Sequence, residues 1–235
     1  MDFSFVIPVY NEEREVIESL DIVWGFLSKQ NFTFELIIVD DGSTDRTLAL
    51  IREFSARDGR IIVRELPANQ GKGEAVKQGM LAAHGDYRFF FDIDLSVPLE
   101  TINVFATIIG KQKPEVIIGT RKTRGATIVK KQPFYREWLG KGFTRLTNGI
   151  LGTSFSDITC GFKCFSSAAA MRIFASQRTK RWSFDSEILF LTKRFGYRFV
   201  EVPVTWRNDP DTRVRLLKDV IRSFKELVDI RLHYL

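Results

Sequence analysis

Cysteine and histidine are scarce in this chain of 235 residues, which contains two of each. Two cysteines cannot form a disulfide framework, and so few cysteines and histidines do not supply a Cys/His zinc site. No apolar run approaches the roughly 18 residues that a membrane-spanning helix requires. The 7 prolines and 16 glycines are too few for a collagen-like or low-complexity chain. These absences favour a globular protein of a reducing compartment, and we expect the cytosol.

The length and composition fit one sizeable domain. Hydrophobic residues make up 44% of the chain and charged residues 27%, so a substantial core can be buried. Residues 1–8 lack a basic stretch and have the composition of a strand, which predicts no signal peptide. We expect a single domain over 1–235, with a first half at 1–120 and a second half at 121–235.

Charge is distributed unevenly along the sequence. The net charge is +6, but acidic side chains outnumber basic ones in residues 1–112, and the reverse holds in residues 113–235. Carboxylates in the first part can bind a divalent metal ion. The basic second part suits phosphates, nucleic acid or an anionic membrane surface.

Short β-rich runs alternate with segments of helical periodicity, which predicts an α/β fold with a mainly parallel sheet. Ligands of such sheets bind beyond the carboxyl ends of the strands. The expected strands are Phe3–Val9, Phe34–Val39, Ile61–Glu65, Tyr87–Asp92, Glu115–Thr120, Phe162–Ser166 and Arg198–Val204. The expected helices are Glu12–Lys29, a segment from the 43–45 turn to Arg57, Gly73–Ala83, Leu99–Lys111, Phe184–Phe195 and Val214–Leu235.

Asp92 and Asp94 lie at the end of the fourth expected strand, which is mostly apolar. Two carboxylates two residues apart point the same way in an extended segment. They can share one hard cation whose other ligands are phosphate oxygens and water. A strand-end turn with solvated acids is the alternative, but polar residues after the neighbouring strands favour the metal site.

Two other polar segments follow expected strands. A turn or helix cap at this strand end needs one acidic residue at most, but Asp40 and Asp41 are two in a row. A carboxylate there can accept hydrogen bonds from the imide or ribose of a nucleotide. Asp45 is the expected helix cap. The segment Asn69–Gly73 has neither P-loop spacing nor the third glycine of a dinucleotide-binding loop. Its glycines are expected to let the backbone approach a ligand or to start a helix.

The second half contains two segments with competing interpretations. Pro133–Leu151 combines aromatic and basic side chains, and we expect it to contact a membrane surface, although its glycines weaken a helix prediction. The apolar stripe of Val214–Leu235 can either pack on the domain or contact the membrane. Its members are Val214, Leu217, Ile221, Phe224, Val228 and Leu232. Cys160 and Cys164 are expected to be small core residues.

Four segments resemble, in order and spacing, glycosyltransferase family 2: Phe5–Glu12, Val39–Asp45, Asn69–Gly73 and Asp92–Asp94. More specifically, Asp157–Lys163, Arg181–Glu187 and Ile230–Leu235 are similar to dolichyl-phosphate β-glucosyltransferases, to which polyprenyl-phosphate mannose synthases are closely related. The eukaryotic enzymes have an N-terminal membrane-anchoring helix, and some relatives have C-terminal spans, that this sequence does not show. The resemblance implies a GT-A fold, a Rossmann-like and mainly parallel sheet flanked by helices, with a basic C-terminal acceptor-side segment.

The activity implied by the resemblance is an inverting, metal-dependent transfer of a hexose. The best match is glucose from UDP-glucose, passed to a polyprenyl or dolichyl phosphate to give a β-linked product. Mg²⁺ or Mn²⁺ held by Asp92 and Asp94 would neutralise the leaving diphosphate. The enzyme would act as a peripheral protein at the cytoplasmic face of a membrane.

The resemblance also assigns residues to roles. The expected catalytic residues are Asp157, Asp94 and Arg121, with Asp157 either orienting a substrate or serving as base for a hydroxyl acceptor. The expected nucleotide-binding residues are Pro8, Tyr10, Glu12, Val39, Asp40, Asp41, Lys72, Asp92 and Ile93. The expected acceptor and phosphate ligands are Arg121, Arg124, Lys130, Lys131, Arg207, Arg213 and Arg215.

Other functions stay open at this point. A GDP-mannose-dependent polyprenyl-phosphate mannose synthase and a family 2 enzyme with a soluble hydroxyl acceptor share the same motifs. A sugar nucleotidyltransferase is disfavoured because its glycine-rich N-terminal phosphate signature is missing. A nucleic-acid-binding module would explain the basic half but not the acidic strand ends, and no nucleic-acid motif is present, so we expect no nucleic-acid partner. The sequence does not set the oligomeric state.

Overall fold

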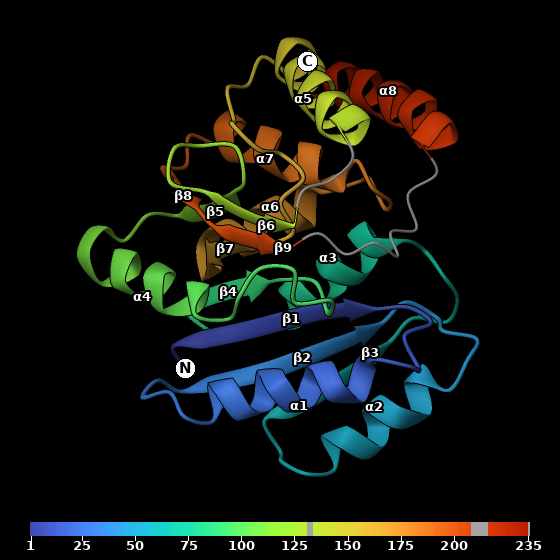
Figure 1. Ribbon diagram of the computed structural model, residues 1–235, viewed down its shortest axis with the longest axis vertical. Helices are drawn as coiled ribbons and strands as arrows, with labels where there is room; N and C mark the ends of the chain where they lie inside the picture. The colour runs from blue at the N-terminus through green and yellow to red at the C-terminus, as the bar shows by residue number, and fades with distance from the viewer. Residues whose placement is uncertain (131–133, 208–215, 235) are drawn as a thin grey trace.

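The central sheet of the protein has seven strands in the order β3-β2-β1-β4-β7-β5-β8. The computed structural model describes residues 1–130, 134–207 and 216–234 (Figure 1). Neighbouring strands are parallel except that β7 is antiparallel to both β4 and β5. A second sheet pairs β6 with β9 in parallel. The α/β class and the mainly parallel sheet are therefore confirmed.

The strands are β1 (Phe3–Val9), β2 (Phe34–Asp40), β3 (Ile61–Glu65), β4 (Tyr87–Phe90), β5 (Val116–Thr120), β6 (Thr127–Lys130), β7 (Lys163–Ser166), β8 (Phe199–Pro203) and β9 (Thr205–Arg207). The helices are α1 (Val16–Leu27), α2 (Thr47–Ser55), α3 (Lys72–Ala82), α4 (Thr101–Gln112), α5 (Phe134–Leu151), α6 (Ser167–Ser176), α7 (Phe184–Arg194) and α8 (Leu216–His233).

Helices cover both faces of the central sheet, because successive residues of a strand point to opposite faces. In β1, Phe5 and Ile7 belong to one core, and Val6 belongs to the other. The first core packs the sheet against α1, α2 and α4, and the second packs it against α3, α6, α7 and α8. Figure 1 shows α1 and α2 below strands β1–β3, with α5 and α8 beside each other at the top. The polar loops are left to gather at the strand ends.

Several expected boundaries differ from the structure. The fourth strand ends at Phe90, two residues earlier than predicted, and the chain turns where the Leu95 N–H donates to the Asp92 carbonyl. The strands β6 and β9 and the helix α6 were not predicted. β6 pairs with β9 across a long sequence separation, Thr127 opposite Thr205, and such a pairing leaves little local pattern.

In the part of α8 whose side chains are described, the buried residues are not those of the predicted stripe. Leu227 and Ile230 are buried in the second core, whereas Phe224 and Leu232 of the predicted stripe are exposed, Leu232 by 63%. Val214 and the side chains of Leu217 and Ile221, which also belong to the predicted stripe, lie outside the described part. The helix is apolar on more than one side, so its hydrophobic pattern did not identify the packing face. Within the described ranges, no helix is both long and apolar enough to cross a membrane.

Candidate active site

The loops after β1 and β2 are bonded to each other at the carboxyl edge of the sheet. The Asn11 N–H, in a backbone with a φ of 53°, donates to Ser43 Oγ at 2.9 Å, and the Thr44 N–H donates to Asn11 Oδ1 at 2.8 Å. The Glu12 N–H donates to Thr47 Oγ1 at 2.8 Å. Asp45 Oδ1 accepts from the Thr47 N–H at 2.9 Å, but Arg46 occupies the N-cap position of α2, so the predicted cap by Asp45 is wrong by one residue. Pro8, Tyr10 and Glu12 thus lie on one wall with the end of β2.

Asp40 and Asp41 are both buried at the end of β2, but they are engaged differently. Asp41 accepts the N–H groups of Gln70 at 2.8 Å and Gly71 at 2.9 Å, and so fixes the loop before α3. Burial raises the pKa of Asp41, and these N–H donors act against the rise. Asp40 Oδ2 accepts from the Ser43 N–H at 2.9 Å, while Oδ1 has no hydrogen-bond partner among the described residues. Only Asp40 therefore offers an uncommitted oxygen.

Two of the expected nucleotide-binding residues direct their side chains into the core. Val39 is fully buried in the second core, and Ile93 is buried in the first. Each lies beside a carboxylate, Asp40 in one case and Asp92 and Asp94 in the other. Their side chains anchor the polar residues at the sheet edge.

Asp92 and Asp94 lie on a turn and not on the extended strand expected from the sequence. Asp94 Oδ1 accepts the Ser96 N–H at 2.9 Å, which holds the turn closed. Desolvation in the turn and the nearby charge of Asp92 both raise the pKa of Asp94, although its side chain reaches solvent. The two carboxylates are therefore neighbours despite the different backbone.

Asp92 is confined by two residues from distant parts of the chain. Its Oδ1 forms an ion pair with the Lys72 ammonium at the first residue of α3. Its Oδ2 faces Gly161, where an added Cβ would collide with the carboxylate. Lys72, predicted as a nucleotide-binding residue, thus lies at the acidic turn, and the loop containing Asp157 lies against the same carboxylate.

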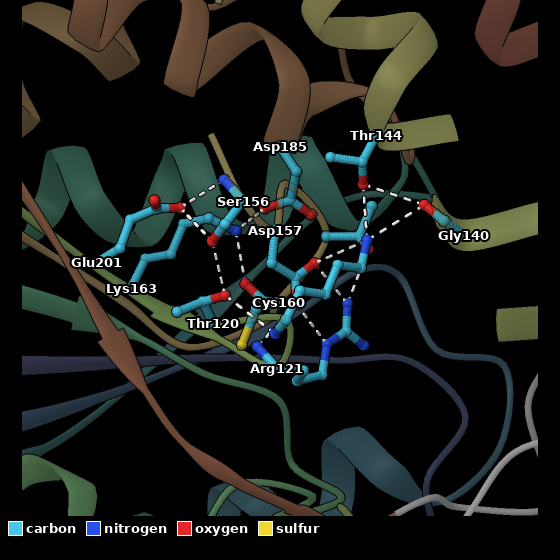
Figure 2. A network of polar contacts seen from close by, with 12 residues as sticks. Thr120, Arg121, Gly140, Thr144, Ser156, Asp157, Cys160, Lys163, Asp185 and Glu201 are labelled. Carbon is cyan, nitrogen blue, oxygen red and sulfur yellow. Dashed lines mark hydrogen bonds and ion pairs between the residues drawn. The ribbon is translucent and has the colours of Figure 1, made fainter. Parts of the chain in front are cut away.

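Asp157 and Arg121 form a bidentate ion pair after β5 (Figure 2). Arg121 Nε donates to Asp157 Oδ2 at 2.7 Å, and Nη2 donates to Oδ1 at 2.9 Å. Burial acts to raise the pKa of the fully buried Asp157, but Arg121 and Lys122 outweigh it and hold the pKa at about 2. Such a carboxylate is a weak base whose oxygens are committed, so its geometry is that of a positioning group.

Lys122 connects this pair to helix α5. Its Nζ lies 3.5 Å from Asp157 Oδ1 and donates to Thr144 Oγ1 at 2.6 Å. Figure 2 shows Thr144 and Gly140 on the α5 side of the network. On the opposite side, Ser156 bonds Glu201 of β8, with Oγ to Oε1 at 2.7 Å. The Arg121–Asp157 pair is therefore braced by α5 and by the central sheet.

A buried pair of opposite charges lies deeper in the same network. Lys163 Nζ donates to Asp185 Oδ1 at 2.5 Å and to the Cys160 carbonyl at 2.6 Å. Burial raises the pKa of Asp185, and the charges of Lys163 and Lys72 act against the rise. This pair ties the Asp157–Lys163 segment to the start of α7, close enough to Lys72 for the charges to interact. Cys160 and Cys164 are buried and free, as expected.

The expected basic ligands are placed unequally. The Arg207 N–H donates to the Ser96 carbonyl at 2.9 Å, which brings the end of β9 to the acidic turn, and its side chain is exposed. Arg124 is exposed in the loop before β6, and Lys130 ends that strand. Lys131, Arg213 and Arg215 lie outside the described residues. Of the expected set, Arg121 pairs with Asp157, and Arg207 lies beside the acidic turn.

Several site residues carried no assignment at the sequence level. They are Lys122, Gly161, Lys163 and Asp185. Gly161 had one local signal, its place in a segment shared with Asp157. Asp185 had another, because it is one of two acids in the first turn of α7.

The acidic turn offers two hard oxygen ligands to a metal ion. No cluster of three or more acidic, histidine or cysteine side chains suited to a metal occurs in the described ranges. Paired carboxylates with few other protein ligands fit Mg²⁺ or Mn²⁺, which take their remaining ligands from phosphates and water. The residues present therefore fit a cation that arrives with a nucleotide diphosphate.

Comparison with known proteins gives close agreement over nearly the whole chain. The family model for glycosyl transferase family 2 matches residues 4–174. The dolichyl-phosphate beta-glucosyltransferase of Saccharomyces cerevisiae is 35% identical over 249 residues, covering 99% of this chain and 75% of that protein. The dolichyl-phosphate beta-glucosyltransferase of Dictyostelium discoideum is 31% identical over 243 residues, covering 99% of this chain and 74% of that protein.

A solved structure confirms the expected GT-A architecture. Glucosyl-3-phosphoglycerate synthase from Mycobacterium tuberculosis, in complex with Mn²⁺, UDP and glucosyl-3-phosphoglycerate, matches with a TM-score of 0.69 and 20% identity. The match covers 99% of this chain and 79% of that one. Taken with the family model and the yeast relative, this agreement shows that the chain belongs to glycosyltransferase family 2 and is a glycosyltransferase.

Proposed function

We propose that this glycosyltransferase transfers glucose from UDP-glucose to a dolichyl or polyprenyl phosphate. The observation that carries this function is the similarity, over 99% of the chain, to relatives named dolichyl-phosphate beta-glucosyltransferase. The first half, 1–120, would bind the nucleotide sugar, and the second half, 121–235, would bind the acceptor.

On the donor side, Asp40 would select the base. Its buried Oδ1 has no partner within the described residues, and an unpaired buried oxygen is destabilising until a donor reaches it. One such acceptor matches the single imide N–H of uracil, whereas guanine presents adjacent N–H groups. Pro8, Tyr10 and Glu12 on the neighbouring loop would line the rest of the base and ribose site.

At the diphosphate, Asp92 and Asp94 would hold Mg²⁺ or Mn²⁺. When bound, the ion supplies Lewis-acid stabilisation of the charge on the leaving group. Lys72 is close enough to bind a phosphate oxygen of the same nucleotide, since its ammonium lies at Asp92.

On the acceptor side, Arg121 would bind the lipid phosphate, with Arg124 and Arg207 contributing charge. Asp157 fixes the guanidinium plane of Arg121 through two hydrogen bonds. A phosphate monoester is already an anion at neutral pH, so it attacks the anomeric carbon without a general base. Direct displacement inverts that carbon and gives a β-linked product from an α-linked donor.

Nucleotide choice tests the donor half of the proposed function. We expect UDP to bind more tightly than GDP in the presence of Mg²⁺, measured by isothermal titration calorimetry. We also expect UDP release from UDP-glucose to depend on a short polyprenyl phosphate. Tighter GDP binding would instead identify a mannose synthase, and turnover with a soluble hydroxyl acceptor alone would identify a different acceptor class.

A membrane contact is proposed at the exposed face of α5 and α8, because a polyprenyl phosphate resides in a bilayer. On α5, Trp138 is 79% exposed and lies with Leu139 and Leu146 among the basic residues Lys141 and Arg145. On α8, Phe224 and Leu232 are exposed next to Lys225 and Arg231. Phe143, expected at the membrane, is half-buried against the second core instead. Apolar and basic side chains together suit the headgroup level of the cytoplasmic leaflet.

Co-sedimentation with anionic liposomes tests this contact. The wild-type protein is expected to sediment at low salt and to dissociate as salt rises, because each basic residue near the surface contributes about 1 kcal/mol that salt screens. The double variant Trp138→Ser/Leu146→Ser should sediment poorly. The matched control Ile22→Ser/Val104→Ser removes exposed apolar residues from α1 and α4 and should behave as wild type. Equal sedimentation of both variants would show that α5 is not the contact.

A further inference from the structure

Lys72 places a positive charge directly on one of the two carboxylates of the acidic turn. Its ammonium forms an ion pair with Asp92 Oδ1, and both side chains are partly exposed. The ammonium occupies this carboxylate oxygen and competes with any other cation for Asp92.

The backbone that carries Lys72 is fixed on several sides. The Gly71 N–H, at a φ of 108°, donates to Asp41 Oδ2 at 2.9 Å, and the Glu74 N–H donates to the Lys180 carbonyl at 3.0 Å. At Gly73, an added Cβ would lie 2.6 Å from Phe184 Cβ. The start of α3 cannot withdraw from the site, so only the flexible side chain of Lys72 can leave Asp92.

The other oxygen of Asp92 lies against the backbone of a different loop. Oδ2 faces the Gly161 backbone so closely that even a methyl group there would collide with it. With Lys72 on Oδ1 and the Gly161 backbone beside Oδ2, a metal ion that binds Asp92 would come close to the Lys72 ammonium. A divalent ion and an ammonium on the same carboxylate repel each other strongly at such short range.

We propose, resting on the proposed metal site at Asp92 and Asp94, that Lys72 is a resident counter-ion of that site. The ammonium leaves Asp92 when a metal ion and a nucleotide diphosphate enter together, and it then binds a phosphate oxygen. The Trp182 ring, whose centroid lies 5.8 Å from Lys72 Nζ, offers the ammonium a second attractive contact as it moves away from Asp92. Metal ion alone would bind weakly, and metal and nucleotide would each strengthen the binding of the other.

Mn²⁺ binding, followed by the electron paramagnetic resonance signal of the free ion with and without UDP, tests this role without any turnover. Lys72→Met is expected to bind Mn²⁺ alone at least about tenfold more tightly than wild type, since a like charge is removed from the site. The same variant should bind UDP more weakly in the presence of Mn²⁺. Lys72→Arg keeps the charge and should retain weak binding of Mn²⁺ alone. Lys111→Met removes an exposed lysine of α4 and should match wild type.

Two negative outcomes are distinguishable. If wild type binds Mn²⁺ with UDP but Lys72→Met binds Mn²⁺ alone no more tightly than wild type, Lys72 is not the counter-ion and the metal site stands. If Mn²⁺ binds neither protein even with UDP, the metal site is wrong and the role of Lys72 is overturned with it. Thermal melting of each variant identifies any loss of fold.

Discussion

Replacing Asp94 by asparagine is expected to lower turnover about a hundredfold, because one well-placed group that stabilises developing charge contributes roughly 3 kcal/mol. This substitution removes the negative charge of Asp94 but keeps the size and hydrogen-bonding oxygen of its side chain. Asp94 Oδ1 accepts the Ser96 N–H at 2.9 Å, and the amide oxygen of asparagine can accept the same bond. The turn should persist while one of the two anionic metal ligands is lost. Initial rates of UDP release at saturating Mg²⁺, with thermal melting in parallel, measure both effects.

A matched control comes from the same region of the chain. Glu100, just before α4, is exposed like Asp94, and Glu100→Gln removes one negative charge without touching the acidic turn. That variant should keep wild-type turnover. Retention of full activity by Asp94→Asn, or by the wild type in excess EDTA, would contradict metal-dependent catalysis at this turn.

The contrast between Asp94 and Gly161 shows which parts of the site a sequence can predict. Asp94 lies in the turn that follows an apolar strand, and the alternation of strands and helices already assigns that turn to the ligand-binding edge. Gly161 reaches the same edge from a loop distant in the sequence, and its role follows from contact with Asp92. Local periodicity in the sequence predicts a position at a strand end, but it does not predict a contact between two segments that are distant in the sequence.

The same distinction accounts for the elements that differ from expectation. β1 and β3 were predicted with correct bounds because their apolar runs are compact. β6 pairs with β9 only through long-range contact, and Lys163 meets Asp185 only when β7 lies beside α7. For α8, two apolar stripes exist, and tertiary packing selected Leu227 and Ile230. Buried charge pairs and helix-face selection depend on neighbours that no local window contains.

Asp157→Asn is expected to destabilise the protein by about 3 kcal/mol, because removing one partner of a buried ion pair leaves the other uncompensated. For a chain of this size the melting temperature should fall by roughly 6 to 12 °C. Arg121 is the stranded partner, and its two hydrogen bonds to Asp157 are lost or weakened. The double variant Asp157→Asn/Arg121→Met no longer strands the guanidinium, and Lys122 keeps its hydrogen bond to Thr144, so it should be more stable than the sum of the single effects predicts.

The pH dependence of stability follows from the same carboxylate. The folded-state pKa of Asp157 is about 2, below its ordinary value of 3.8, because Arg121 and Lys122 outweigh the effect of burial. A depressed pKa contributes stability above the unfolded-state pKa, about 2 kcal/mol here, and loses it as pH falls from about 4 toward 2. The free energy of unfolding, measured with urea across that range, should therefore fall less with decreasing pH for Asp157→Asn than for wild type. An equal fall in both proteins would refute the pairing.

Kinetics of Asp157→Asn separate a positioning role from a catalytic base. If Asp157 fixes Arg121 for the acceptor phosphate, the variant should raise the KM for a short polyprenyl phosphate more than it lowers kcat. The acid limb of the kcat–pH profile should then be unchanged, because a group with a pKa of about 2 is ionised throughout the assay range. A general base would behave differently: kcat would fall by about 10² to 10⁴. That second pattern would assign Asp157 to proton transfer and favour a hydroxyl acceptor over a phosphate.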